Sequence, residues 1–512
     1  MHLEPVIGLE IHVQLKTKSK MFCGCSNRGE YEPPNTTVCP VCLGEPGALP
    51  VVNRQAVEFG VLIGLALGGR IAEKSKFDRK NYFYPDLPKG YQISQKDLPV
   101  VEGGSVSFAV TEKDGRRRTA TVRLNRVHLE EDAAKLMHSP DGKSSYVDFN
   151  RGGTPLAEIV TEPDIATPAE AKAFLQELRM IMRYLGVSDA DMEKGQLRCD
   201  ANISLRRLPE KPAREKWPSQ LNPKTEVKNI NSFRSVEKAL EHEIERQTLL
   251  WINGDPPAKQ STRGWDDDKN VTVPQREKEE AHDYRYFPEP DLPPLDLTEI
   301  TAAVRGRVPE LPGARRQRFV EEYGFSEADA RIVCDDQDLA NYAEQVMSEL
   351  QAWFEATPEA GGQKPDWQKH LAEFAKLAGG WLLTKLGGVM AEMKIGPRDL
   401  KITPEDFAEL LSLIHQKKLT GQNALIVLEI MAATGADPSI IMEEKNLGQV
   451  EDRAELEIVV QNVIAANPGV VADWRKGKGN AIQFLVGQVM KTTRGKSPPQ
   501  TAREMLEKEL NK

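Results

Sequence analysis

The hydrophobic pattern of this 512-residue chain changes its period near Pro294, and this change limits the fold more than any other feature. Upstream, residues 6–15 and 196–206 alternate between apolar and polar side chains, as half-buried strands do. Downstream, residues 314–323 and 339–354 carry apolar side chains at helical spacing. The sequence therefore predicts an α+β protein with a strand-rich N-terminal part followed by helical parts.

Three domains are expected from the length and from the positions of the breaks. The Asp-Leu-Pro-Pro segment at 291–294 ends the strand-rich part. We predict a strand-rich domain over residues 1–294, a helical domain over 295–400 and a helical tail domain over 401–512.

The composition and the N-terminal sequence argue against a membrane protein and a secreted protein. The longest apolar stretch, near residues 61–67, is far shorter than the roughly 20 residues of a membrane span, and the N-terminus lacks a cationic region ahead of an apolar one. The expectation is a cytoplasmic protein without a membrane segment. A net charge of −9 argues against a protein that coats DNA without regard to sequence. The same net charge is compatible with a local basic surface that binds nucleic acid.

Four of the six cysteines form two close pairs, Cys23 with Cys25 and Cys39 with Cys42. Two thiolate pairs supply the four soft ligands of a tetrahedral zinc site, and a reducing compartment disfavours disulfides. A closed four-cysteine site leaves no open coordination position, so the pattern predicts a structural zinc knuckle rather than a catalytic metal. A group of simply buried thiols is the alternative.

Hard metal ligands occupy the polar faces of several predicted strands. Glu10 and His12 share the face of the first strand, His128 opens a His-Leu-Glu-Glu-Asp run, and Asp200 and Asn202 share the face of a later strand. Carboxylate and amide oxygens suit Mg²⁺ and its bound phosphates. Each carboxylate alone is more simply explained as part of a solvated strand face, but their joint occurrence predicts a site.

Residues 77–85 add groups that suit phosphate chemistry. Arg79 and Lys80 could neutralise phosphate oxygens, and Tyr82 or Tyr84 could stack or donate a hydrogen bond. The chain contains neither a Walker A motif nor a Gly-x-Ser-x-Gly elbow, so an ordinary P-loop and an α/β-hydrolase amidase are both disfavoured. A nucleophilic serine would have to come from a partner.

The end of the chain is locally basic. Residues 469–512 contain nine Lys or Arg against four acids, which makes this segment the best candidate for phosphate contact with RNA. Solvated helix faces explain the same charge equally well. The candidate contacts are Arg475, Lys476, Lys478, Lys491, Arg494 and Lys496.

Taken together, these segments closely resemble the B-subunit family of the aspartyl/glutamyl-tRNA amidotransferases, heterotrimers that make Asn-tRNA and Gln-tRNA from misacylated precursors. The resemblance covers essentially the whole chain and implies a cradle domain, a helical domain and a tail domain. The segments that carry it are residues 7–12, 76–86, 91–95, 128–132, 147–156, 197–202 and 283–291.

The resemblance also implies a mechanism. ATP would phosphorylate the side-chain carboxylate of Glu-tRNA(Gln), Asp-tRNA(Asn) or both, and ammonia would then displace the phosphate. An amidase-like A subunit would release the ammonia from glutamine and pass it through an internal channel, and a small C subunit would tie the other two together. Phosphorylation is chemically necessary because oxide is too poor a leaving group for an amine to displace.

Site residues follow from the same resemblance. It implies that Glu10, His12 and Glu131 bind Mg²⁺, with Asp200 as a neighbour. Strict alternation along the His-Leu-Glu-Glu-Asp run favours Glu130 instead, so Glu131 needs a β-bulge. The residues implied around the channel mouth are Lys80, Tyr82, Lys89 and Glu131. The rival function is a non-catalytic, zinc-stabilised tRNA-binding protein of the same complex, which presents its substrate to an active site elsewhere.

Overall fold

The computed structural model describes most of the chain, and its contacts divide the chain into two units, residues 1–313 and 314–512. The described residues are 3–112, 114–207, 221–277, 284–356, 366–448, 453–475, 478, 480–493, 496–497 and 499–511.

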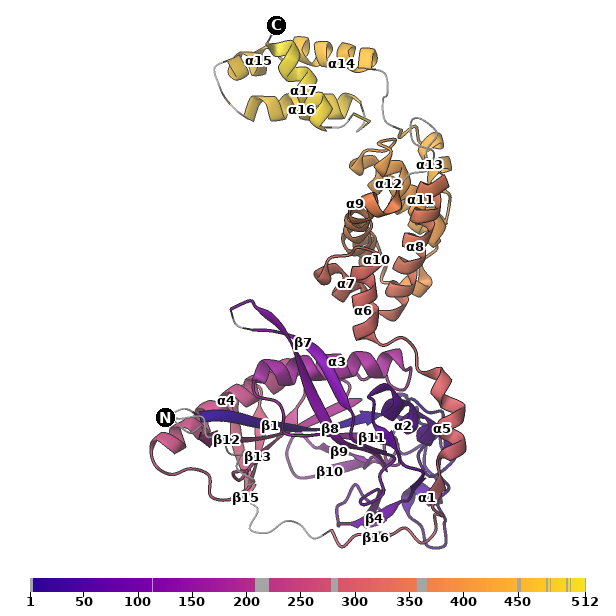
Figure 1. The fold of residues 1–512 in the computed structure, drawn as a ribbon, viewed down its shortest axis with the longest axis vertical. Coiled ribbons are helices and arrows are strands. Elements are labelled where there is room, and N and C mark those ends of the chain that lie inside the picture. Colours follow the sequence, from indigo (N-terminus) through magenta and orange to yellow (C-terminus); the bar gives the residue numbers. More distant parts are fainter. Residues whose placement is uncertain are drawn as a thin grey trace. The chain divides into compact units, whose positions relative to one another are not determined.

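A large mixed sheet forms the centre of the first unit (Figure 1). Its strands follow the order β15-β14-β13-β12-β1-β11-β8-β6-β2, with β7 also paired to β8. All neighbours are antiparallel except β13 and β14. The strands are β1 (Leu3–Gln14), β2 (Arg70–Ile71), β6 (Val101–Glu102), β7 (Ser105–Thr111), β8 (Arg117–Glu131), β11 (Pro155–Thr161), β12 (Leu197–Arg207), β13 (Thr225–Ile230), β14 (Ser261–Asp266) and β15 (Val271–Glu277).

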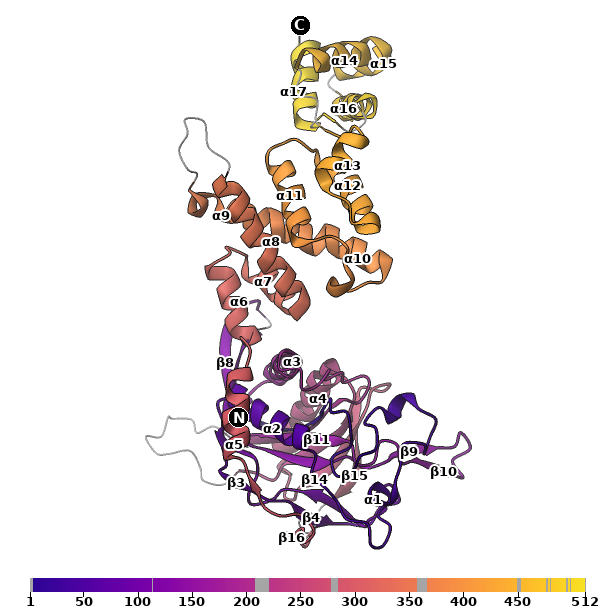
Figure 2. The same ribbon diagram turned by 90° about the vertical axis from the view of Figure 1, so that its right-hand side faces the viewer.

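The alternation of β1 decides which face of this sheet is buried. Ile7, Leu9, Ile11 and Val13 are at most 1% exposed and belong to the core of the first unit. The helices α3 (Pro168–Tyr184) and α4 (Phe233–Ile252) lie side by side over this sheet (Figures 1 and 2). The polar residues of β1 therefore project from the other face.

The helix α3 begins at Pro168. Thr167 caps the helix by accepting a hydrogen bond from the backbone N–H of Glu170. The other helices of this unit are α1 (Pro40–Leu43), α2 (Arg54–Ala66), α5 (Thr298–Val304) and the short 3₁₀ helices Gly29–Tyr31 and Arg305–Arg307.

Small sheets complete the first unit. One consists of β4 (Asp78–Asn81), β5 (Tyr91–Ser94) and β16 (Phe287–Pro288). Arg79 ties this sheet together, because its Nε and Nη2 donate to the buried carboxylate of Glu289 at 2.7 and 2.9 Å. The remaining pairs are β3 (Lys74–Ser75) with β17 (Leu295–Asp296), and β9 (Lys135–His138) with β10 (Ser145–Asp148).

The second unit is helical, as the spacing predicted. One hydrophobic core runs from Phe319 to Ile441 without a break at residue 400, and a second core spans Leu456 to Leu510. The α+β fold class is thereby confirmed, while the three domain limits stay a prediction. The helices are α6 (Pro312–Glu321), α7 (Glu327–Cys334), α8 (Gln337–Ala356), α9 (Trp367–Gly380), the π-helix Trp381–Leu386, α10 (Gly387–Met393), the 3₁₀ helix Pro397–Asp399, α11 (Pro404–His415), α12 (Gly421–Thr434), α13 (Pro438–Glu444), α14 (Arg453–Ala466), α15 (Pro468–Arg475), α16 (Asn480–Thr492) and α17 (Pro499–Leu510).

Within the described part of the chain, no single helix is both long and apolar enough to cross a membrane. The bent pair α12 and α13 passes that test by length and composition alone. Its buried residues, among them Val427, Met431 and Ile441, belong to the core of the helical unit.

Candidate functional site

A row of ionisable side chains crosses three strands on the polar face of the sheet. His12 of β1 lies opposite Glu158 of β11, and Glu158 lies opposite His128 of β8. Facing residues on antiparallel neighbours project to the same side, so these three side chains meet. Glu130, two residues beyond His128, projects from the same face.

The distances within this group are short. His12 Nε2 lies 3.4 Å from Glu130 Oε1 and 3.3 Å from Glu158 Oε2. His128 Nε2 lies 3.2 Å from Glu158 Oε2 and 3.7 Å from Glu130 Oε2, and Ser94 Oγ donates to Glu130 Oε2 at 3.0 Å. One ligand atom each from His12, Glu130 and Glu158 lies within 4.8 Å of the others, a spacing that suits a divalent cation.

Mutual attraction sets the charges in this group. Burial by itself lowers the pKa of His12, but hydrogen bonds to Glu130 and Glu158 raise it to about 10. Burial opposes ionisation of Glu130 and Glu158 as well, yet the two imidazoles hold the pKa of both carboxylates below the ordinary value. Both carboxylates are therefore ionised at neutral pH and could bind a cation.

Lys80 and Tyr82 face this group from the small sheet that contains β4. Both line the same cavity as His12, Glu130 and Glu158. Burial alone would lower the pKa of Lys80, but the nearby carboxylates, Glu130 first, raise it, so the ammonium stays charged. The Lys80 Nζ also lies 5.1 Å from the centre of the Tyr284 ring.

A second polar row lies beside the first. Glu10 is opposite Asp200 of β12, and the Asn202 amide donates to Glu10 Oε1 at 3.2 Å. Asp200 accepts a hydrogen bond from Lys228 Nζ at 2.6 Å. The Nζ of Lys224 lies 3.9 Å from Glu10 Oε1. Asn202 therefore contacts Glu10 directly, and Asp200 lies opposite Glu10 on the neighbouring strand.

Glu131 lies elsewhere. Its carboxylate is buried, forms an ion pair with Lys89 and accepts a hydrogen bond from the backbone N–H of Ile93 at 3.0 Å. The pairing of β8 with β11 continues without a shift from Arg126 to Glu131, so the bulge that Glu131 needs to join His12 is absent. Glu130, the residue that strict alternation favours, occupies the position beside His12.

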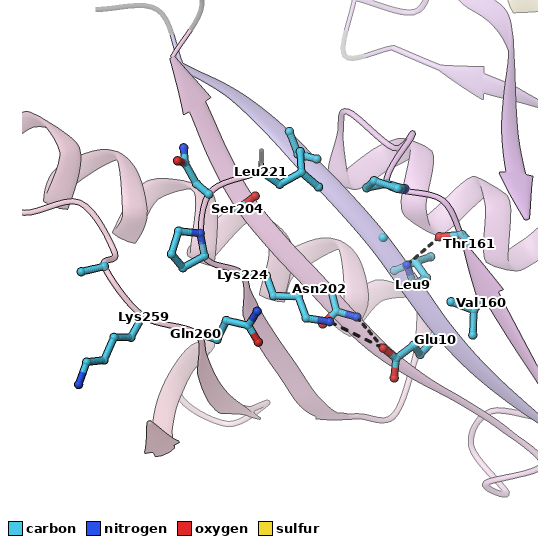
Figure 3. A pocket seen from close by; sticks show the side chains of 16 residues that line it. Leu9, Glu10, Val160, Thr161, Asn202, Ser204, Leu221, Lys224, Lys259 and Gln260 are labelled. Atoms are coloured by element: carbon cyan, nitrogen blue, oxygen red, sulfur yellow. Dashed lines mark hydrogen bonds and ion pairs between the residues drawn. The ribbon is translucent and has the colours of Figure 1, made fainter. Parts of the chain in front are cut away.

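Two cavities open on these rows. We call the larger one, about 810 Å³, the acidic cavity; it is lined by His12, Glu130, Glu158, Lys80, Tyr82, Asp200 and further polar residues. The adjoining cavity, about 640 Å³, combines apolar walls with a few polar groups (Figure 3). Its lining residues are Val6, Gly8, Leu9, Glu10, Val160, Thr161, Pro163, Asn202, Ser204, Leu221, Asn222, Pro223, Lys224, Ala258, Lys259 and Gln260.

The four predicted cysteines do converge. Their Sγ atoms all lie within 4.8 Å of one another, and those of Cys39 and Cys42 are 3.9 Å apart. Tetrahedral zinc–thiolate geometry requires sulfurs about 3.8 Å apart. A hydrogen bond from Cys23 lowers the pKa of Cys42 to about 4. The donor set therefore fits a structural zinc ion.

A fully buried lysine supports this cluster. Lys20 is 0% exposed, its Nζ lies 3.8 Å from Cys42 Sγ, and it donates to the carbonyl oxygen of Phe149 at 3.2 Å. The cluster also contacts the Lys89–Glu131 pair, because Gly44, which ends α1, packs directly on Lys89.

Of the predicted tail residues that the structure describes, Arg475 ends α15, Lys491 lies in α16, and Lys478 and Lys496 lie just outside these helices. Arg475, Lys478 and Lys491 are exposed, and Lys478 pairs with Asp473 at 3.0 Å. Lys496 is partly exposed and donates to Asn446 at 2.7 Å. Lys476 and Arg494 lie outside the described residues.

Sequence reasoning missed Glu158 and Lys224. Glu158 stands in the Pro-Leu-Ala-Glu-Ile-Val-Thr strand, and a single carboxylate inside such an apolar run is a signal that could have identified it. Lys224 follows a polar loop, and nothing in its local sequence distinguishes it from a solvated lysine.

Comparisons with known proteins found matches that cover nearly the whole chain. A family sequence model described as the GatB/GatE catalytic domain matches residues 5–303, and one described as the GatB domain matches residues 367–510. The chain is 48% identical over 513 residues to the B subunit of the aspartyl/glutamyl-tRNA(Asn/Gln) amidotransferase of Thermomicrobium roseum, covering 100% of this chain and 99% of that protein. It is 46% identical over 516 residues to the corresponding B subunit of Moorella thermoacetica, covering 100% of both chains.

Proposed function

This chain belongs to the GatB/GatE family, and from that premise we propose that it is the B subunit of a tRNA-dependent amidotransferase. In this subunit, ATP would activate the aminoacyl carboxylate and ammonia would then amidate it. The chain would act as a carbon–nitrogen ligase that hydrolyses ATP. The observation that supports this most is the cross-strand group of His12, Glu158 and His128 with Glu130, which faces Lys80 in one cavity.

The proposed reaction has two steps. A side-chain carboxylate oxygen of the aminoacyl-tRNA bonds to the γ-phosphorus of ATP, and the bond from that phosphorus to ADP breaks. The ammonia nitrogen then bonds to the acyl carbon, phosphate leaves with the electron pair, and the nitrogen loses a proton. Carboxylate activation is needed because the unmodified carboxylate has no leaving group.

Glu130 and Glu158 would hold a divalent cation, which we take to be Mg²⁺, and His12 would join them once the metal displaces the proton of its imidazole. Such an ion, when bound, neutralises phosphate charge and polarises the phosphoryl group. His128 would orient Glu158 and Ser94 would orient Glu130, since each contacts the carboxylate directly. Glu10, which was also expected as a ligand, lies two residues before His12 on β1 and would act beside the phosphate chain of ATP.

Lys80 and Tyr82 would bind the anionic end of the substrate. Lys80 keeps its charge although it is largely buried, so it can attract the aminoacyl carboxylate and then the acyl phosphate. Asp200 is already paired with Lys228 and would keep that lysine in place beside the substrate.

The adjoining cavity would hold the nucleoside of ATP. Its volume lies within the roughly 300–1,000 Å³ typical of small-ligand sites. Val6 and Val160 offer apolar surface for a base, and Asn202 and Ser204 offer hydrogen bonds. Because Glu10 borders both cavities, a triphosphate could extend from one into the other.

Ammonia would come from a partner. This chain lacks the Gly-x-Ser-x-Gly elbow of a hydrolase, which agrees with an amidase-like A subunit and a small C subunit in a cytoplasmic heterotrimer. Lys89 and Glu131 would lie at the entry of ammonia, where a buried ion pair can exclude water. Zinc would be structural, held by the four cysteines.

The test is ADP release by the heterotrimer, given ATP, Mg²⁺, ammonium and either Glu-tRNA(Gln) or uncharged tRNA. Release that requires the misacylated tRNA supports carboxylate activation. Release that is indifferent to the aminoacyl group contradicts it.

The rival function, a non-catalytic tRNA-binding protein within the complex, is separated by one substitution. If Glu10 borders the reacting phosphates, Glu10→Gln abolishes product formation and leaves tRNA affinity nearly intact. Unchanged turnover would favour the rival.

We also propose that the last helices bind tRNA through Arg475, Lys476, Lys478, Lys491, Arg494 and Lys496. Removing residues 453–512 should weaken tRNA binding and flatten its dependence on salt, because fewer counterions are released. An unaltered salt slope would refute phosphate contact by this segment.

A further inference from the structure

We propose that Lys224 is a catalytic residue that binds the γ-phosphoryl group while it passes from the adjoining cavity to the acidic cavity. This inference rests on the proposed function and adds a residue to it. The proposal starts from the lining of the two cavities. Among the described residues, Glu10 and Lys224 alone line both cavities.

Figure 3 shows how these two residues face each other. Lys224 extends from the segment before β13 towards Glu10 on β1, and Lys259 points away into the open side of the cavity. Because this pair borders both cavities, a group that moves from one to the other along their shared boundary comes close to it. A phosphoryl group in transit would therefore meet one carboxylate, which repels it, and one ammonium, which attracts it.

The side chain of Lys224 is held loosely. Its Nζ lies 3.9 Å from Glu10 Oε1, too far for a hydrogen bond, while the close partner of Glu10 is the Asn202 amide at 3.2 Å. Lys228, within β13, differs: it contacts Asp200 at 2.6 Å and Glu226 at 3.2 Å. Of these two lysines, Lys224 can change partners at lower cost.

The backbone of Lys224 is fixed, in contrast to its side chain. Its carbonyl oxygen accepts a hydrogen bond from the backbone N–H of Ser261 at 3.2 Å, and the next residue, Thr225, is paired with Ile203 of β12. A lysine whose backbone is fixed but whose ammonium has no close partner can follow the phosphoryl group as that group moves.

The chemistry needs a cation at this place. As the aminoacyl carboxylate bonds to the γ-phosphorus and the bond to ADP breaks, negative charge stays on the phosphoryl oxygens and grows on the leaving oxygen. Lys224 would stay protonated throughout and stabilise that charge. Glu10, once its ion pair with Lys224 opens, remains hydrogen-bonded to Asn202.

The experiment compares Lys224→Met, Lys224→Arg and the control Lys143→Met in the heterotrimer; Lys143 is exposed between β9 and β10 and lines neither cavity. ADP release is measured with ATP, Mg²⁺, ammonium and Glu-tRNA(Gln), and kcat is separated from the KM for ATP. We expect Lys224→Met to lower kcat by about 10²–10³-fold, as loss of one charge-stabilising donor does. Lys224→Arg should restore most of the rate, and Lys143→Met should match the wild type.

Three results would overturn the proposal. The first is a kcat of Lys224→Met close to that of the wild type, including the case in which the KM alone rises. The second is loss of tRNA binding by Lys224→Met, which would indicate a structural role. The third is an equal loss in Lys143→Met. Failure of the proposed function is distinct, because the wild-type complex itself would then release ADP without need of the aminoacyl group.

Discussion

Replacing Gly44 by alanine should disturb the ion pair beside the cysteine cluster. Gly44 adopts φ +70° at the end of α1, and a Cβ built there would lie 2.5 Å from Lys89 Cγ and 3.1 Å from the backbone N and Cα of Lys89. A left-handed conformation costs a residue with a side chain about 1–2 kcal/mol. Overpacking against backbone adds about 1–3 kcal/mol. We therefore expect Gly44→Ala to destabilise the first unit by about 2–5 kcal/mol.

Gly47→Ala is the matched control. Gly47 also has a positive φ, +86°, but a Cβ there meets no atom within 4 Å. It should cost only the conformational part, about 1–2 kcal/mol. By calorimetry, with about 2 °C lost per kcal/mol in a unit of this size, the first unit of Gly44→Ala should melt roughly 2–6 °C below that of Gly47→Ala.

Activity provides the second measurement for this pair of variants. Displacement of Lys89 should separate it from Glu131, so glutamine-dependent amidation should fall in Gly44→Ala and persist in Gly47→Ala at a temperature where both are folded. Equal melting temperatures and equal activities of the two variants would refute the argument that Gly44 positions Lys89.

Three further outcomes are expected. Glu130→Gln should raise the Mg²⁺ concentration needed for ADP release by at least about 10–100-fold, while Glu162→Gln, at a partly exposed position outside both cavities, should not, and a magnesium titration of both distinguishes them. Cys42→Ser should lower the zinc content from about one ion per chain and lower the melting temperature, as metal analysis and calorimetry would show; full zinc content would contradict the cluster. Hydrogen bonding from Arg318 lowers the pKa of Glu344 below the 4.5 of a free side chain, so its contribution to stability is present above that pH and disappears as pH falls through the lower folded value. Glu344→Gln should therefore destabilise the helical unit by about 1–3 kcal/mol at neutral pH and much less near pH 3, and a pH-independent difference in urea unfolding would contradict this.

Strand alternation predicted much of the local structure. It placed Glu10 and His12 on one polar face and favoured Glu130 over Glu131 on β8, as the continuous register there confirms. The helical character of the second unit also followed from residue spacing.

The assembled site could not be derived in the same way. Glu158 joins His12 because β11 inserts between β1 and β8, a pairing of segments more than 140 residues apart, which local periodicity does not encode. The position of Lys224 between the two cavities likewise depends on where the segment before β13 joins the sheet, which the local sequence does not encode.

The central position of β1 has a consequence for how this family can vary. Glu10, which borders both cavities, and His12, which reaches the cation-binding group, are two residues apart on a strand that is paired on both sides. Extended backbone fixes their separation at about 7 Å. Insertion or deletion of a single residue between them would turn one of the two side chains into the apolar core. Length changes should therefore be tolerated in the loops around β1 and eliminated within it, because this short segment sets a constant distance between the residue that borders both cavities and the residue that contacts Glu130 and Glu158.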